Sequence, residues 1–280
     1  MMMHLTTTQK QRLAALSAPE DEQNTVFLDI HERDAFFKER EKFHADLNRR
    51  KILQMLNHDR RPLLLEIEGT LSEWLIHEEG FTRVVTPTFI TADMLLRMRI
   101  GREHPLADQV FWIDGKRCLR PMLAPNLYEL MGKLRRITRD PVRIFECGSC
   151  FRKESRGPRH LNEFTMLNFV ELAGAADGEQ QQRLTKLAHG AMSALGIAEY
   201  ELTVEKSEVY GETLDIVING EEIASGAYGP HPLDDNWRIC DVWVGMGFGL
   251  ERIAMVKGGY QNIRRAGRGL AYLDGASLSI

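Results

Sequence analysis

The glycine-rich stretch at residues 245–252 carries the strongest chemical signal in the chain. It reads Gly-Met-Gly-Phe-Gly-Leu-Glu-Arg and runs into an apolar helical pattern over residues 250–256. Glycines at alternate positions let a backbone come close to a ligand, and Arg252 stands where the free N–H groups of a helix start favour anions. The spacing differs from the G-x-G-x-x-G dinucleotide fingerprint, and the sequence contains no G-x-x-x-x-G-K-[ST] loop. The stretch therefore indicates another kind of anion-binding turn, with a plain strand-to-helix turn as the alternative.

Two further groups have side chains suited to phosphates and a divalent cation. Arg152, in the sequence Phe-Arg-Lys-Glu, has a planar guanidinium that suits two oxyanions at once. Glu222 and Ser225 lie three residues apart in a predicted strand. Oxygen ligands of this type suit Mg²⁺, which takes few protein groups besides substrate phosphates. A surface arginine and an ordinary edge-strand pair are the alternative interpretations.

Two predicted elements present apolar rows that would face a pocket. Four residues share one face of a predicted helix: Ala124, Leu127, Tyr128 and Met131. Four residues at period two share one face of a predicted strand: Phe164, Met166, Asn168 and Val170. The amide of Asn168 is costly to bury in this row unless it finds a partner. That partner is either the protein backbone or a carbonyl on the side chain of a substrate.

The composition is that of an ordinary globular protein with a slight excess of acid. The chain has 280 residues, of which 43 % are hydrophobic and 27 % charged, and its net charge is −4. No apolar run approaches the roughly 18 residues that span a bilayer, and no secretory signal is visible. Four cysteines do not make a disulfide framework, so we expect a cytoplasmic protein. Basic runs at residues 133–143 and 257–268 indicate a phosphate-backbone footprint or solvated helix ends.

Hairpin signals indicate how the elements that position these residues are joined. Asp114-Gly115 lies between β-like stretches at residues 110–113 and 117–120, and Asn219-Gly220 lies between similar stretches at residues 214–218 and 221–227. Strands joined by hairpins form antiparallel sheets. Other predicted strands cover residues 81–86, 142–152 and 163–172, and predicted helices cover residues 64–75, 124–137 and 180–195. Together these elements predict an α+β fold, an antiparallel sheet flanked by helices.

Three stretches in this order resemble the signature motifs of the class II aminoacyl-tRNA synthetases. Residues 80–87 are similar to motif 1, residues 151–172 to motif 2, and residues 245–252 to motif 3. Longer strings resemble the pyrrolysyl-tRNA synthetase family: LRPMLAPNLY at 119–128, FRKES at 151–155, HL at 160–161 and EFTMLN at 163–168. The similarity spans roughly residues 60–280. It is closest to the short forms that lack a separate N-terminal tRNA-binding domain.

The resemblance implies an enzyme that joins an amino acid to tRNA with ATP and Mg²⁺. Arg152 would clamp the α-phosphate and the substrate carboxylate, and Arg252 would cover the adenine and reach the γ-phosphate. Both are implied as catalytic, while Glu222 and Ser225 are implied at the metal–phosphate site. Phe164 would stack on the other face of the adenine. The residues implied at the ATP site are Arg152, Glu154, His160, Leu161, Phe164, Glu222, Ser225 and Arg252.

The resemblance also implies a deep apolar pocket for pyrrolysine or a related N-ε-acylated lysine. Asn168 would donate to the side-chain carbonyl, Trp243 would wall the cavity, and Tyr210 would close over the pyrroline ring as a lid. The residues implied at the amino-acid site are Ala124, Leu127, Tyr128, Met131, Met166, Asn168, Val170, Tyr210, Ala227, Trp243 and Gly245. Tyr228 departs from the small or branched aliphatic residue expected there, and would either trim the pocket floor or pack behind it.

Domain organisation and partners follow from the same resemblance. Residues 1–60 are expected to form an N-terminal helical extension and residues 61–280 the catalytic domain. A homodimer is expected, with apolar residues of the helix at 64–75 at its interface. A cognate tRNA is the expected partner, a membrane is not, and assistance by a separate tRNA-binding protein stays open. The alternatives are a class II synthetase for another large apolar or aromatic amino acid, and a non-catalytic tRNA-binding paralogue. Asn168 argues against the first, and Arg152 and Arg252 argue against the second.

Overall fold

The computed structural model describes residues 2–153, 157 and 159–280, which divide into two compact units. Unit 1 consists of Met1–Leu63 together with Arg264–Ile280, and unit 2 consists of Leu64–Ile263. The sequence-based boundary near residue 60 kept residues 264–280 with the larger part, whereas their contacts group them with the N-terminal segment. Among the described residues, every helix is too short or too polar to cross a lipid bilayer.

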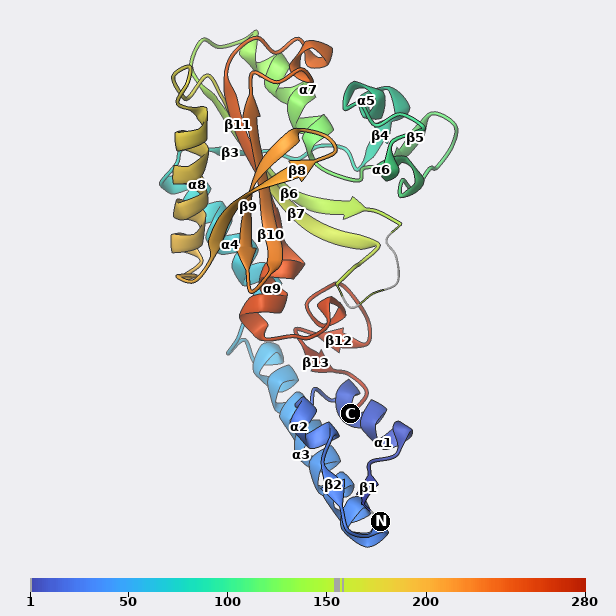
Figure 1. Cartoon of the computed structure of the whole chain (residues 1–280). Coiled ribbons are helices and arrows are strands. Elements are labelled where there is room, and N and C mark those ends of the chain that lie inside the picture. The colour runs from blue at the N-terminus through green and yellow to red at the C-terminus, as the bar shows by residue number, and fades with distance from the viewer. Residues whose placement is uncertain (1, 154–156, 158) are drawn as a thin grey trace. The chain divides into compact units, whose positions relative to one another are not determined.

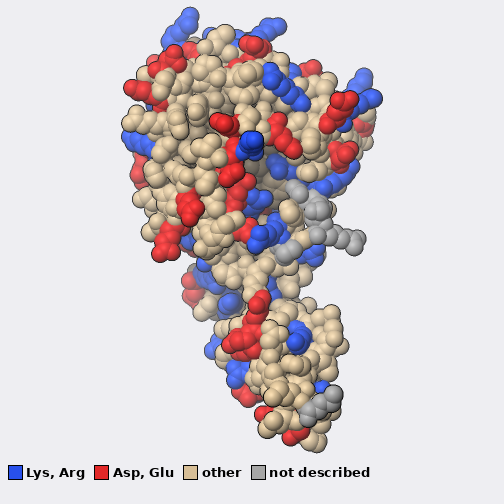
Figure 2. All heavy atoms as spheres, in the orientation of Figure 1, with Lys and Arg blue, Asp and Glu red and all other residues tan. Residues whose placement is uncertain are grey.

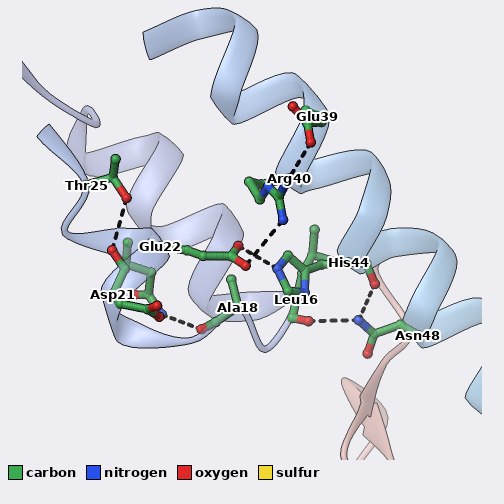
Figure 3. Close-up of polar contacts among 10 residues, drawn as sticks. Leu16, Ala18, Asp21, Glu22, Thr25, Glu39, Arg40, His44 and Asn48 are labelled. Atoms are coloured by element: carbon green, nitrogen blue, oxygen red, sulfur yellow. Dashed lines mark hydrogen bonds and ion pairs between the residues drawn. The ribbon is translucent and has the colours of Figure 1, made fainter. Parts of the chain in front are cut away.

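A long helix, α3 (Ile30–Leu56), organises unit 1. Its buried Asn48 accepts from the Ser277 backbone N–H at 2.6 Å and donates to the Leu16 carbonyl at 2.8 Å, so one amide joins both termini to α3. On the same helix, His44 lies 2.7 Å from the Glu22 carboxylate (Figure 3). The other elements of unit 1 are β1 (Met3–His4), α1 (Thr7–Ala15), α2 (Glu20–Gln23), β2 (Val26–Phe27), β12 (Tyr272–Leu273) and β13 (Ala276–Ser277).

A sheet of seven strands, counted over the described residues, forms the centre of unit 2 (Figure 1). The strand order is β3-β6-β7-β11-β10-β9-β8, and all neighbours are antiparallel except β3, which is parallel to β6. This arrangement confirms the predicted α+β fold. The strands are β3 (Thr82–Arg83), β6 (Val142–Phe151), β7 (Glu163–Leu172), β8 (Glu201–Ser207), β9 (Gly211–Ile218), β10 (Glu221–Gly229) and β11 (Trp243–Gly249).

Helices lie on both faces of this sheet. α8 packs along β10 and β11 (Figure 1), and its residue Gly190 touches Trp74 of α4 so closely that a Cβ there would lie 2.7 Å from the indole ring. α7 packs on β6 and β7. The helices of unit 2 are α4, which begins at the last residue of unit 1 (Leu63–His77), α5 (Ala92–Arg97), α6 (Pro105–Asp108), α7 (Ala124–Arg135), α8 (Gln180–Ala194), the 3-10 helix η1 (Asp234–Trp237) and α9 (Leu250–Gly258).

Both predicted hairpins are present, and one of them has a further strand beside it that was not predicted. Asn219 and Gly220 turn with φ of 52° and 77° and join β9 to β10 in register, as predicted. The Asp114 carboxylate likewise caps its turn by accepting from two backbone N–H groups at 2.7 and 2.8 Å. The predicted arms of this turn pair through the antiparallel bridge between Trp112 and Cys118 and through two backbone hydrogen bonds of 2.9 Å, from the Ile113 N–H to the Arg117 carbonyl and from the Leu119 N–H to the Phe111 carbonyl. In addition, β5 (Arg117–Leu119) pairs with β4 (Phe89–Thr91), which was not predicted.

Two predicted strand boundaries also change. The strand expected over residues 81–86 is reduced to β3, because the backbone N–H of Thr86 turns away to donate to the Glu146 side chain at 3.1 Å. β8 was not predicted, since its residues are mostly exposed and lack an apolar row. β8 and β9 nevertheless pair along seven positions, and the turn between them carries Tyr210.

Candidate active site

Two adjoining cavities lie on the face of the sheet opposite α8. The larger has a volume of about 460 Å³ and the smaller about 50 Å³. They form one continuous site because several residues line both: Ala124, Asn168, Tyr210, Thr213, Ser225 and Gly247. On the face of unit 2 shown in Figure 2, basic side chains lie in a hollow flanked by acidic ones, and the larger cavity is lined by three arginines, Arg152, Arg159 and Arg252.

Every predicted site residue that the structure describes lines at least one of these cavities. The larger cavity alone receives Arg152, His160, Leu161, Phe164, Met166, Glu222 and Arg252. The smaller cavity alone receives Leu127, Tyr128, Met131, Val170, Ala227, Trp243 and Gly245. Both are lined by Ala124, Asn168, Tyr210 and Ser225. Glu154 lies outside the described residues. The charged side chains thus gather in the larger cavity, beside apolar ones such as Phe164 and Met166, whereas the predicted residues that line only the smaller cavity are all apolar or aromatic.

The alternating glycines of β11 make room for the side chains of β7. A Cβ at Gly247 would lie 2.7 Å from Asn168 Nδ2, and a Cβ at Gly245 would lie 3.0 Å from Val170 Cγ1. These positions face each other across the paired strands. The sequence pattern suggested that the glycines allow a ligand to approach the backbone. In the structure, their missing side chains leave space for Asn168 and Val170 of β7.

Arg152 is held in a fixed position at the wall of the larger cavity. Its Nε donates to the Pro121 carbonyl at 2.9 Å, and its Cζ lies 5.3 Å from the centroid of the Phe164 ring. The flat face of the guanidinium therefore has an aromatic neighbour, a contact that favours Arg over Lys. Such anchoring directs a planar donor into the cavity before any ligand arrives.

Arg252 and Glu222 contact each other across the same cavity. Arg252 Nη1 lies 2.8 Å from the Glu222 carbonyl oxygen and 3.3 Å from its Oε1. Desolvation raises the pKa of the Glu222 carboxyl above its ordinary value, and Arg252 opposes that shift. Because desolvation disfavours the charged form of this carboxyl, a cation beside it would stabilise the carboxylate. Ser225, on the same strand, adds a hydroxyl oxygen to the cavity wall.

The start of α9 depends on Glu251, a buried residue that was given no role from the sequence. Its carboxylate accepts from the Thr165 backbone N–H at 2.8 and 2.9 Å and from the Thr165 hydroxyl at 2.8 Å. These bonds join α9 to β7 immediately beside Arg252. The Glu-Arg pair that ends the glycine-rich stretch therefore has two tasks: one residue fixes the helix and the next faces the cavity.

A buried ion pair supports α7, the helix that carries the apolar row. The sequence did not predict this pair either. Arg120 Nη1 contacts Glu146 Oε1 at 2.7 Å, and the Thr86 hydroxyl donates to Glu146 Oε2 at 2.6 Å. Asn126, in the first turn of α7, donates to the Thr86 hydroxyl at 2.6 Å. Because these partners are far apart in sequence, local patterns gave no signal for them.

Asn168 stands at the junction of the two cavities with an unused amide oxygen. Its Oδ1 is buried and has no hydrogen-bond partner among the residues that the structure describes. Buried polar groups are nearly always paired. An amide oxygen accepts hydrogen bonds, so this position can take a donor group of a ligand.

Tyr210 and Tyr228 lie on different sides of the sheet. Tyr210 lines both cavities from the β8–β9 turn, where its backbone N–H donates to the Ser207 hydroxyl at 3.2 Å. Tyr228 follows Ala227 on β10, so the alternation of the strand turns it to the other face, where it is 43 % exposed. It lines neither cavity, so it does not trim the pocket floor.

Comparison with known proteins identifies the family of this chain. No protein-family model matches the chain. A crystal structure of pyrrolysyl-tRNA synthetase from Desulfitobacterium hafniense is similar with a TM-score of 0.91 and 49 % identity, covering 99 % of each chain. A second structure of a pyrrolysyl-tRNA synthetase from that organism has a TM-score of 0.89 and 48 % identity, covering 99 % of this chain and 98 % of that one. The chain described here therefore belongs to the pyrrolysyl-tRNA synthetase family, whose catalytic domain is of the class II type.

Proposed function

We propose that this protein activates pyrrolysine, or a related N-ε-acylated lysine, with ATP and transfers it to its cognate tRNA. The observation that carries the proposal is the pair of adjoining cavities with Asn168 at their junction. One cavity offers the cationic groups that a nucleotide requires, and the other offers an apolar slot. The Asn168 amide between them can donate from Nδ2 and accept at its unpartnered Oδ1, which matches a substrate whose long side chain contains an amide with one carbonyl and one N–H.

Activation requires a carboxylate to attack the α-phosphorus of ATP and release pyrophosphate. The step needs positioning and charge neutralisation more than a proton donor. Arg152, fixed by Pro121 and Phe164, would hold the two reacting anions together. Arg252 would exchange its contacts with Glu222 for phosphate oxygens, at a helix start that already favours anions. Phe164 would offer an aromatic face to the adenine.

Glu222 and Ser225 are the protein groups that would hold Mg²⁺. Both line the larger cavity, and the raised pKa of Glu222 favours a cation beside it. Among the described residues, no three His, Cys, Asp or Glu side chains gather as they do at a closed metal site. Two oxygen ligands completed by phosphates are the usual arrangement for Mg²⁺. When bound, the ion supplies charge neutralisation for the phosphates.

We also propose a two-fold dimer, the assembly that motif 1 implies. The apolar residues expected at that interface mostly pack inside unit 2, since Ile67, Leu71 and Leu75 are at most 1 % exposed. Leu65 on α4 and Val85 after β3 stay on the surface, with 58 % and 88 % exposure. These two residues are therefore the better candidates for a contact between subunits.

Charge reversal at Arg136 and Arg139 is expected to weaken tRNA charging and leave pyrophosphate exchange unchanged. Both are exposed at the end of α7, whereas Arg135 is committed to Asp241, with N–O distances of 2.8 and 2.9 Å. Each phosphate that the variant no longer neutralises should flatten the slope of log affinity against log salt by roughly 0.7 to 0.9. Filter binding of tRNA at several salt concentrations, with exchange assays in parallel, measures both. Equal loss of charging and exchange would make this surface structural.

The amino-acid specificity is tested by pyrophosphate exchange against a panel of amino acids. Pyrrolysine and N-ε-acyl or N-ε-carbamate lysines should support exchange, and free lysine should be weaker by roughly 100-fold or more. The reason is that the apolar slot would have to desolvate an ammonium group, which costs several kcal/mol, and each 1.4 kcal/mol is about tenfold.

Two other outcomes of this panel would contradict the proposal. Robust exchange with phenylalanine and none with acyl-lysines would favour a synthetase for an aromatic amino acid. Exchange with no amino acid, in a protein that still binds tRNA, would favour a non-catalytic paralogue. Arg152, Glu222 and Arg252 together at one cavity argue against the second outcome.

A further inference from the structure

The deep end of the smaller cavity is built on a buried carboxylate, Asp234, that no sequence pattern singled out. Asp234 begins η1, is 5 % exposed, and stands behind the cavity wall without lining it. Two of its neighbours, Tyr128 and Trp243, do line that cavity. A buried carboxylate needs hydrogen-bond donors to compensate for desolvation. The donors of Asp234 therefore show which side chains it holds in place.

Three donors converge on this carboxylate. Trp243 Nε1 lies 3.0 and 2.9 Å from its two oxygens, the Tyr128 hydroxyl lies 3.3 Å from Oδ1, and the His231 backbone N–H lies 2.7 Å from Oδ2. Desolvation raises the pKa of Asp234, and the hydrogen bonds from these donors oppose that rise. The Trp243 indole and the Asp234 carboxylate also pack closely against the backbone at Gly229, because a Cβ there would overlap both groups.

The segment that carries Asp234 also contacts Tyr210, the residue expected to act as a lid. His231 Nδ1 accepts from the Leu233 backbone N–H at 3.1 Å, so the ring proton is on Nε2, which donates to the Tyr210 carbonyl at 3.0 Å. The Tyr210 ring centroid lies 5.7 Å from that of His231 and 6.2 Å from that of Trp243. Asp234 therefore contacts two wall residues directly and the lid turn through His231.

A rigid support lies on the other side of the carboxylate. Trp237, at the end of η1, stacks on Tyr128 with centroids 5.4 Å apart and planes at 23°. The guanidinium of Arg97 covers Trp237 at 3.9 Å from its ring centroid. Because η1 is packed in this way, the position of Asp234 is set by η1. The hydrogen bonds of Asp234 in turn set the positions of Tyr128 and Trp243.

We infer that Asp234 is a positioning residue for side-chain recognition: it fixes Tyr128 and Trp243 in the pocket wall and, through His231, the resting position of Tyr210. The inference rests on the proposed function, since it assumes an amino acid whose long side chain enters the smaller cavity. The carboxylate would then set how far that side chain can reach. A residue that only stabilised the fold would affect all substrates alike.

Asp234→Asn is the direct test, because it keeps the shape and replaces one acceptor by an NH₂ group that faces a donor. For pyrrolysine or a bulky N-ε-carbamate lysine, we expect the amino-acid KM in pyrophosphate exchange to rise about tenfold, the scale for one charge-assisted hydrogen bond. The KM for N-ε-acetyl-lysine, whose side chain is shorter, should change less than threefold, and the KM for ATP should not change. Asp235→Asn is the matched control, since this neighbour is exposed.

Trp243→Phe provides a second, independent readout. It keeps an aromatic ring in the wall but deletes the Nε1–H that contacts Asp234. The same selective rise in KM is expected, and adding Asp234→Asn to this variant should cost less than it does in the wild type, as coupled partners require. If Asp234→Asn fails to fold, Trp243→Phe alone decides.

The outcomes distinguish a failure of the role proposed for Asp234 from a failure of the proposed function. Equal changes in KM for the bulky and the short substrate, or additive effects in the double variant, would overturn the role of Asp234 while the wild-type activity stands. A wild-type protein that activates neither lysine derivative would instead overturn the proposed function, and the inference with it.

Discussion

Replacing Arg152 by alanine is expected to lower amino-acid-dependent pyrophosphate exchange by about 10²–10³-fold, the scale for one preorganised charge-stabilising group. The Pro121 carbonyl and the Phe164 ring already hold the guanidinium at the cavity wall. It therefore does not have to reorganise when charge develops between the carboxylate and the α-phosphate. The measurement is the exchange rate at saturating ATP and amino acid, with circular dichroism to verify the fold.

Two companion variants give this prediction its controls. Arg152→Lys keeps the charge but loses the planar fork and the aromatic contact, so it should recover only part of the rate. Arg117→Ala removes an exposed arginine that lines neither cavity and is paired with Asp114 at 2.8 Å. An exposed pair is worth about 0–1 kcal/mol, so its effect should be small. Near-normal exchange in a folded Arg152→Ala protein would refute the assigned role.

Much of the candidate site could be predicted because local spacing determines which face of an element a residue occupies. The row on α7 and the row on β7 each follow from a single periodicity, 3.6 or 2, and both rows line the cavities. The strand β7 itself was predicted with the observed ends, Glu163–Leu172, since a polar loop precedes it and an apolar alternation runs through it. The Asn219-Gly220 turn was predictable for a similar reason, because its backbone conformation favours those two residues.

The groups that support the site could not be predicted in this way. Asp234 meets Tyr128 across more than a hundred residues of sequence, and Glu251 meets Thr165 across 86. No periodicity relates such pairs, since the chain path between elements decides which loop arrives at which strand. The pairing of β5 with β4 was missed for the same reason: the Asp114 turn and its two arms were correctly predicted, but a turn does not determine which strand lies on the other side of the hairpin.

Replacing Asn168 by alanine is expected to reverse the preference between two classes of substrate. The Asn168 Oδ1 has no partner among the described residues, and the amide stands where the two cavities join, beside Gly247. If its Nδ2 group donates to the side-chain carbonyl and its Oδ1 accepts from the amide N–H of the same substrate, the loss of Asn168 should cost acyl-lysines about 1–3 kcal/mol, the range for stranding a buried polar partner. That range corresponds to roughly fivefold to 150-fold in kcat/KM. The deleted amide also enlarges an apolar cavity, so bulky aromatic amino acids should gain.

Asn126→Ala is the control for this reversal, because the Nδ2 group of Asn126 is bonded within the protein, although its Oδ1, like that of Asn168, has no partner among the described residues. Its Nδ2 donates to the Thr86 hydroxyl at 2.6 Å and to the Pro87 carbonyl at 2.8 Å. Its loss should lower the melting temperature and reduce all activities together, the result expected of a structural amide. Asn168→Ala should instead change the ratio of kcat/KM for one acyl-lysine and one aromatic analogue, with little change in melting temperature. If Asn168→Ala behaves like Asn126→Ala, its amide supports the fold and the substrate carbonyl is recognised elsewhere.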